Sequence, residues 1–353
     1  MHTRLFCRPR LAGLLMAGIL LFTSLLAPVT ARADETGGLD AATLARIDRH
    51  NLIQWGMQKS YLPENPSDHT IVEWEARDRF AKEGRACNGM SRFAAFESMH
   101  AFTVGDLIGM AFESVEGVSR KEVTSGPLRS WANQQGFRSL NLCNLDALAT
   151  RYDLMDVLYH LSADGAEVDK GVLRAPYFNQ VLGYYIGKEG DIWHHGEWGD
   201  TTFKINGHTL GVAGCGFTVT AMALSYCLDR IVAPTEYMEN GQYTGDGAQH
   251  SVGEFTARQY GLPVTRTNDW GAALAALRQG YPVMALESGP SFWSQNGHYI
   301  LMVGALSDGT IAVYNPGLIE QTYRTNGGIS YETSKITDTQ AQDGAYTIFG
   351  LGS

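Results

Sequence analysis

The chain has 353 residues, of which 44% are hydrophobic and 18% are charged. This length and composition are sufficient for the cores of about two ordinary domains, and they exclude a disordered chain. The formal net charge is −10 at pH 7, which disfavours nucleic acids and anionic membrane surfaces as partners.

Residues 1–33 have the three parts of a cleavable secretion signal. A basic start with Arg4, Arg8 and Arg10 precedes the apolar run Leu11–Leu26, and Ala31-Arg32-Ala33 is a cleavage site of the A-x-A type. Removing residues 1–33 takes away four arginines and no acidic residue, so the net charge falls from −10 to −14. We therefore expect a secreted or cell-envelope protein with no integral membrane domain after cleavage. An uncleaved anchor is the alternative interpretation of the apolar run.

Residues 34–164 are predicted to form a mostly helical domain. Six stretches have a helical pattern of apolar residues, which are Leu39–Met57, Val72–Lys82, Met90–Phe102, Leu107–Phe112, Leu128–Gln135 and Leu145–Leu161, and steps of three and four are clearest in the last. No motif in this half indicates a chemistry. A pro-segment, a targeting or wall-binding module and a substrate-recognition module all remain open as its role.

A polar break with a linker at residues 165–171 leads into a second domain, residues 172–353, that is richer in glycine, aromatic and β-branched residues. Turn and capping residues in this domain predict an entry strand and three helices. One helix follows Cys215, a second begins at a Ser251–Glu254 capping box and ends at Gly261, and a third is capped by Asn268 or Asp269 and ends at Gly280. The remaining patterns predict strands at Pro282–Glu287, His298–Leu306, Thr310–Asn315 and Ala345–Leu351, and the entry strand covers Val172–Gln180. The fold class is therefore α+β.

Cys215 lies between Gly214 and Gly216, where a loop meets an apolar helix. We expect the two glycines to let the backbone turn tightly beside the thiol. The positive end of the helix dipole favours a thiolate at this position, and a thiol with a lowered pKa is a nucleophile at neutral pH. The alternative is a buried cysteine in a glycine-rich turn.

A base and a residue to orient it are predicted at the open end of a hairpin. His298 begins one strand, Asn315 ends the next, and Ser307-Asp308-Gly309 is a turn between them. Antiparallel pairing returns His298 and Asn315 to the same end of the sheet. Together with Cys215 they form a nucleophile, base and orienter in the order Cys, His, Asn.

Three segments carry a family resemblance. Residues from about Ala175 to Leu351 resemble the papain-like cysteine peptidases of the bacteriocin-processing (double-glycine) peptidase-like family, through the segments GCGFT, WGAALAALRQGYPVMALES and NGHYILMVGALSDGTIAVYNPG. The resemblance implies a papain-like fold in which the helix that carries the cysteine packs on an antiparallel sheet. It also implies that Cys215 is the nucleophile, His298 its proton partner and Asn315 the residue that orients the imidazole.

The resemblance further implies that Gln180 donates its side-chain amide to the oxyanion hole, with Asn179 as the alternative donor. Two residues depart from the family pattern. Phe217 stands where the family usually has proline, and its bulk is expected to narrow one side of the cleft. Asn315 stands where the family often has aspartate, and its carbonyl still accepts the imidazole N–H.

These features together predict a secreted cysteine peptidase or amidase that hydrolyses peptide or wall-peptide amide bonds by thiol acyl transfer, without a cofactor or a metal. A transpeptidase with the same triad and a non-catalytic binding or surface protein are the alternatives. A metal site at His194, His195 and Glu197 is a weaker interpretation, since no helical HExxH frame is present.

Four cysteines remain after the signal, and an oxidising compartment permits disulfides. Cys215 and Cys227 are separated by about 18 Å along a helix, too far for a disulfide. We predict a Cys87–Cys143 bridge, which leaves Cys215 free, and we expect Cys227 to be packed as a small hydrophobic residue.

Overall fold

The computed structural model describes residues 55–59, 61, 70–71, 73–85, 102–137, 140–162, 171–173, 175–180, 184–186, 192–194, 204–205, 208–238, 242–244, 247–287, 297–306, 310–317, 329–333 and 341–352. The proposed signal, residues 1–33, lies outside these ranges. Among the described residues, no helix has both the length and the apolar character needed to cross a bilayer.

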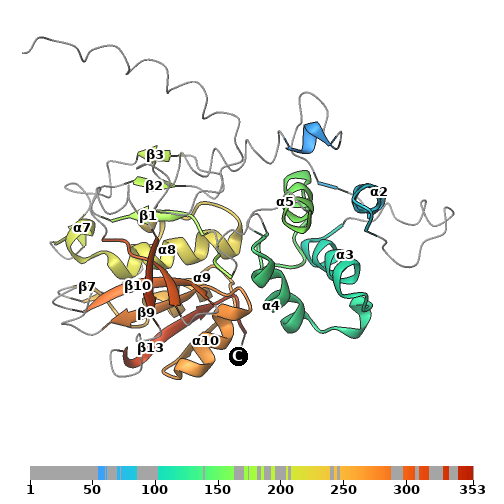
Figure 1. Ribbon diagram of the computed structural model, residues 1–353. Coiled ribbons are helices and arrows are strands. Elements are labelled where there is room, and N and C mark those ends of the chain that lie inside the picture. The colour runs from blue at the N-terminus through green and yellow to red at the C-terminus, as the bar shows by residue number, and fades with distance from the viewer. Residues whose placement is uncertain are drawn as a thin grey trace, which may run out of the picture. The chain divides into compact units, whose positions relative to one another are not determined.

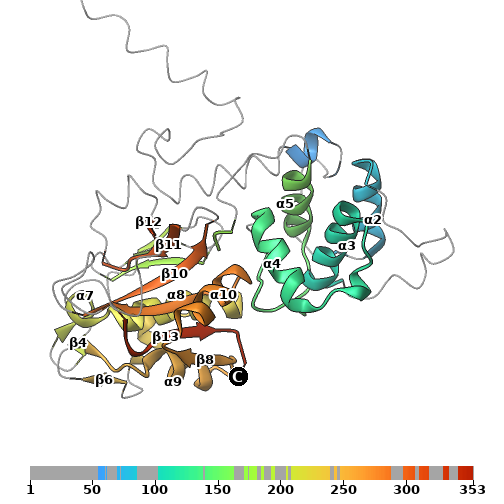
Figure 2. The same cartoon turned by 60° about the horizontal axis from the view of Figure 1, so that its bottom comes forward.

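Helices dominate the first half of the chain (Figure 2). They are α2 (Glu73–Lys82), α3 (Val104–Glu116), the short 3₁₀ helix η2 (Arg120–Glu122), α4 (Ser125–Gln135) and α5 (Arg151–Leu161). The helices predicted at residues 72–82, 107–112 and 128–135 are confirmed. Those predicted at residues 39–57 and 90–102 fall almost entirely outside the described residues.

The predicted helix at residues 145–161 begins six residues later than expected. Thr150 and Asp153 form a capping box that starts α5, with the Thr150 N–H donating to Asp153 Oδ2 at 2.9 Å. The carbonyls of Leu145 and Ala147 accept hydrogen bonds from Gly105 and Val104 at the start of α3. These carbonyls satisfy amides that a helix start leaves unpaired, so residues 145–149 do not continue the helix.

The second half is built on a six-stranded antiparallel sheet in the order β12-β11-β10-β9-β13-β8, of which β9, β10 and β13 are labelled in Figure 1. Three predicted strands are confirmed as β9 (Val283–Glu287), β10 (His298–Ala305) and β11 (Thr310–Tyr314), and the predicted last strand is longer, as β13 (Ala341–Phe349). The sequence patterns did not indicate β8 (Val264–Thr267) or β12 (Ile329–Thr333). The predicted turn at residues 307–309 lies outside the described residues.

The entry strand is shorter than predicted, and smaller sheets accompany it. β1 (Tyr177–Asn179), β2 (Tyr184–Ile186) and β3 (Ile192–His194) form one sheet, while Val172 makes only an isolated bridge to Gly304. The described residues of this half also form two strand pairs and two short helices: β4 (Lys204–Ile205) with β5 (His208–Thr209), β6 (Tyr243–Thr244) with β7 (Gly247–Ala248), α7 (Leu210–Ala213), and the 3₁₀ helix η3 (Pro234–Glu236).

Helices cover both faces of the large sheet. Alternate strand residues such as Leu286, Tyr299 and Leu301 join the core made with α8 (Cys215–Leu228) and α9 (Val252–Gln259). The residues between them, such as Ala285 and Ile300, join a second core with α10 (Trp270–Arg278). This period of two explains why the central strands are buried on both sides. The fold is the predicted α+β arrangement of a cysteine-bearing helix on an antiparallel sheet.

The predicted caps are confirmed in one helix and wrong in the other. Asp269 caps α10, since its Oδ1 accepts from the Gly271 N–H at 2.7 Å. Ser251 precedes α9 but makes no side-chain cap, because its hydroxyl donates to Gln242 Oε1 at 2.8 Å. The Gly261 turn after α9 has the positive φ that glycine favours.

The described residues from 55 onward belong to one compact unit, and the two halves share one hydrophobic core. The side-chain amide of Asn133 donates to Leu277 O at 3.1 Å, and the backbone carbonyl of Asn133 accepts from the Gly171 N–H. The Asn141 amide donates to Cys227 O at 3.2 Å. The Asn133 contact lies at the C-terminal end of α10, and the Asn141 contact lies at that of α8, about 18 Å along the helix from Cys215. The boundaries 34–164, 165–171 and 172–353 stay predictions.

Asn133→Ala is expected to lower the free energy of unfolding by about 1–2 kcal/mol. The variant removes a buried side-chain donor to the Leu277 carbonyl, and Asn133 is 4% exposed. Urea unfolding followed by circular dichroism measures the change. Gln134→Ala, an exposed neighbour on the same helix, is the control and should change stability by no more than about 0.5 kcal/mol. Equal effects of the two variants would contradict a stabilising role for this contact.

Candidate active site

Cys215 is the first residue of α8, with Gly214 as its N-cap. The flanking glycines are needed for space rather than for an unusual turn, since neither has a positive φ. A Cβ on Gly214 would lie 2.3 Å from Leu210 O, and one on Gly216 would lie 2.5 Å from the Ala248 Cβ. The predicted tight turn is thus a close approach of backbone and side chains on both sides of the thiol.

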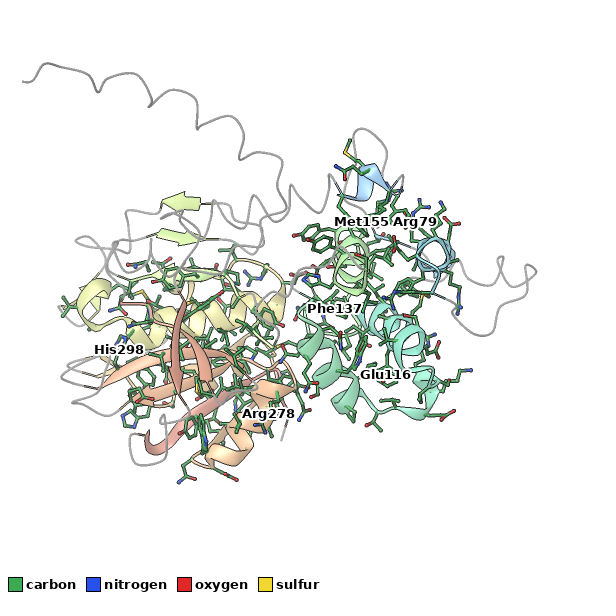
Figure 3. The ribbon with its side chains drawn as sticks, in the orientation of Figure 1. Arg79, Glu116, Phe137, Met155, Arg278 and His298 are labelled. Atoms are coloured by element: carbon green, nitrogen blue, oxygen red, sulfur yellow. The ribbon has the colours of Figure 1, made fainter. Side chains whose placement is uncertain are left out.

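His298 and Asn315 meet as the hairpin predicts. β10 and β11 pair with Leu301 opposite Tyr314, which brings the start of β10 to the end of β11. His298 Nε2 lies 2.9 Å from Asn315 Oδ1, and both residues are buried. His298 is labelled in Figure 3 at the start of β10.

A backbone contact fixes the direction of the Asn315 amide. Its Oδ1 also accepts from the Gly317 N–H at 2.9 Å, so this oxygen faces both donors. Nε2 of His298 is therefore the protonated ring nitrogen, and Nδ1 is left to face the Cys215 sulfur, with which His298 hydrogen-bonds. The arrangement is a nucleophile, a base and an orienting residue in one chain of contacts.

The sulfur and the imidazole change each other's pKa. Burial raises the pKa of Cys215, but the hydrogen bond and charge of His298, with the Tyr299 and Gly216 amides, outweigh it and the net pKa is lowered. Burial lowers the pKa of His298, but the hydrogen bond and charge of Cys215, the Asn315 hydrogen bond and the Glu287 charge outweigh that, and the net pKa is raised. Both shifts favour a thiolate–imidazolium pair near neutral pH.

The dependence of kcat/KM on pH is expected to be bell-shaped. The thiolate is lost as the pH falls through the lowered pKa of Cys215, and the imidazolium is lost as the pH rises through the raised pKa of His298. The two limbs belong to the coupled pair. Hydrolysis and iodoacetamide alkylation, both measured from pH 4 to pH 10, test this. An alkylation rate that rises only near the pKa of an ordinary thiol, about 8.5, would contradict the ion pair.

The comparison with known families bears on the same residues. Residues 173–337, just under half of the chain, match the model described as the Peptidase_C39 like family. The second half of the chain is therefore similar to this family. The match confirms the resemblance to the papain-like, bacteriocin-processing peptidases and indicates a cysteine peptidase. No curated protein gives a match to the chain.

Gln180, the proposed oxyanion donor, contacts the segments that precede Cys215 and follow β11. Its Nε2 donates to Gly211 O at 2.9 Å, and its backbone N–H donates to Pro316 O, next to Asn315. The side chain is 5% exposed, and its Oε1 has no hydrogen-bond partner among the described residues. Gln180 thus connects the segment before Cys215 with the segment after β11.

Asn179, the alternative oxyanion donor, has a different environment. It is fully buried, and its Nδ2 donates to the Tyr177 hydroxyl at 3.2 Å. The Tyr177 hydroxyl in turn donates to Asn315 O at 2.9 Å. Asn179 therefore supports the backbone at Asn315, whereas the amide of Gln180 contacts Gly211, four residues before Cys215.

Phe217 does not narrow the cleft. It is fully buried and packs against Tyr237, whose hydroxyl donates to the Phe217 carbonyl. The prediction was wrong because a residue two positions into α8 points into the core. Among the described residues no cluster of metal-ligating side chains occurs, and the side chains of His194, His195 and Glu197 lie outside those residues.

Cys143 is a free thiol, so the predicted bridge to Cys87 is not formed; Cys87 itself lies outside the described residues. Cys143 instead lies beside Cys227, which is 3% exposed as expected for a packed residue. Burial, together with a side-chain contact with Cys143, raises the pKa of Cys227 well above its usual value. The pKa of Cys215 is shifted in the opposite direction, since it is lowered.

Proposed function

We propose that the protein is an exported cysteine peptidase or amidase that hydrolyses amide bonds of peptides or of cell-wall peptides. The supporting observation is the convergence of Cys215, His298 and Asn315 in a domain of a peptidase family. The secretion signal proposed for residues 1–33 supports export, and with it a substrate outside the cytoplasm.

The proposed reaction begins with the Cys215 thiolate, which attacks the amide carbonyl carbon. The negative charge moves to the carbonyl oxygen, where the Cys215 N–H and the Gln180 amide stabilise it by about 3–4 kcal/mol per donor. His298 gives its Nδ1 proton to the leaving nitrogen as the C–N bond breaks, and a thioester remains. Neutral His298 then takes a proton from water, the hydroxide attacks the thioester, and the acid and the thiolate are released.

The residues act without a cofactor in this scheme, because every proton moves between His298, the substrate and water. Asn315 holds the imidazole in the tautomer that faces the sulfur. If an amine reaches the thioester before water, the same residues carry out transpeptidation. The nature of the acceptor is the difference between the two activities.

A non-catalytic binding protein with the same fold is the competing proposal, and selective alkylation separates the two. At mildly acidic pH, limiting iodoacetamide should label Cys215 stoichiometrically and should leave Cys143 and Cys227 unlabelled, as located by peptide mass mapping. Labelling should abolish the hydrolysis of a peptide or wall-fragment library. Equal and slow labelling of all thiols, with no hydrolysis, would support the binding protein.

A further inference from the structure

Glu287 is a buried carboxylate directly across the sheet from His298. It is the last residue of β9, and its Cα is paired with that of His298 in the antiparallel register. Directly opposed residues of an antiparallel pair point to the same face, with their Cβ atoms about 4.5–5.5 Å apart. Glu287 is 2% exposed, so little solvent screens its charge from the imidazole.

The pairing places the Glu287 carboxylate where it can stabilise the positive charge of the His298 imidazolium. A buried negative charge is costly unless a positive charge or hydrogen bonds compensate it. The imidazolium form of His298 is such a charge, and the Glu287 carboxylate is among the groups that raise the pKa of His298.

The described groups that face His298 come from three elements. The Cys215 thiol comes from α8, the Asn315 amide follows β11, and the Glu287 carboxylate comes from β9. The two ring nitrogens of His298 form hydrogen bonds with Cys215 and Asn315. Glu287 acts on the imidazole through its charge and its position, because the nitrogen contacts are already taken.

We propose that Glu287 is a positioning residue for His298, whose carboxylate keeps the imidazole protonated and in place beside the Cys215 thiolate. The proposal rests on the proposed function, in which His298 must carry a proton to the leaving nitrogen. It adds a fourth side chain to the triad, and this side chain acts through His298 and does not contact the substrate.

The first test is a titration that does not depend on hydrolysis. The His298 imidazole is followed by NMR in histidine-labelled protein with Cys215→Ala, and its signal is assigned by its loss in His298→Gln. Adding Glu287→Gln is expected to move the His298 midpoint to lower pH. Glu122→Gln removes the same charge from an exposed position and should leave the midpoint unchanged.

Glu287→Asp keeps the charge on a side chain that is shorter by one methylene. The titration midpoint of His298 in this variant should lie between the midpoints in the parent protein and in Glu287→Gln. The Asp variant also serves if Glu287→Gln does not fold. A midpoint equal to that of the parent in either folded variant would overturn the proposal and leave Glu287 with a purely structural role.

The second test uses the pH profile of the protein with Cys215 intact. Glu287→Gln should move the basic limb of kcat/KM to lower pH, reduce the rate above that limb about tenfold, and leave KM nearly unchanged. If the basic limb of kcat/KM does not move and hydrolysis is normal, the proposed role of Glu287 is rejected and the proposed function is retained. A shifted NMR midpoint in a protein that hydrolyses no peptide would reject the proposed function and retain the pairing.

Discussion

Replacement of Cys215 by alanine is expected to lower kcat/KM for amide hydrolysis by at least about 10⁴-fold. The variant has no nucleophile, so the acyl-enzyme step is lost and only binding and the oxyanion donors remain. Peptide and wall-fragment profiling of the wild type against Cys215→Ala measures the effect, and it also identifies the substrate class.

Cys143→Ala is the matched control. This second half-buried cysteine contacts the far end of α8, and it should retain kcat/KM within about twofold. Thermal unfolding of both variants separates chemistry from folding. A folded Cys215→Ala protein with wild-type hydrolysis would eliminate the thiol mechanism.

Gln180→Ala is expected to reduce kcat by about 10²–10³-fold with little change in KM. An oxyanion donor acts on charge that develops in the transition state, and its loss therefore appears in kcat. The contact of its amide with the carbonyl of Gly211, four residues before Cys215, supports this expectation. Steady-state kinetics on the best substrate from the profiling experiment measures the split between kcat and KM.

Asn179→Ala distinguishes the two candidate donors. Asn179 is buried and contacts the Tyr177 hydroxyl, so we expect its replacement to cost stability, by about 1–3 kcal/mol. The kinetic loss should be smaller than that of Gln180→Ala. The reverse order, with kcat falling most in Asn179→Ala and hardly in Gln180→Ala, would assign the oxyanion hole to Asn179.

Sequence reasoning was most successful where a local signal and the fold agree. The strands that carry His298 and Asn315 have an apolar pattern that can be recognised within each segment. Their antiparallel pairing brings His298 Nε2 to 2.9 Å from Asn315 Oδ1. It was less successful where a local signal competed with a tertiary contact. Ser251 had the pattern of a cap, but its hydroxyl donates to Gln242 across a loop.

The cause of the lowered thiol pKa also differs from the sequence-based expectation. The position at a helix start pointed to the dipole and the free amides of α8, and one of these, from Gly216, does contribute. The larger lowering effects are the hydrogen bond and the charge of His298, which is 83 residues later in the chain. Charge pairing at short range in a buried site outweighs the end of a helix dipole.

The sequence alone determined the central strands β9, β10 and β11, the helices that flank them, the α+β class, and the three residue types of the triad, because these depend on periodicity and on motifs within short segments. Tertiary structure decided which residues surround the triad. The pairing of Glu287 with His298, the direction of Phe217 and the contact of Cys143 with Cys227 all depend on register and packing between distant segments. The pattern within one segment does not specify these contacts, since the register of one strand against another is set by the whole core.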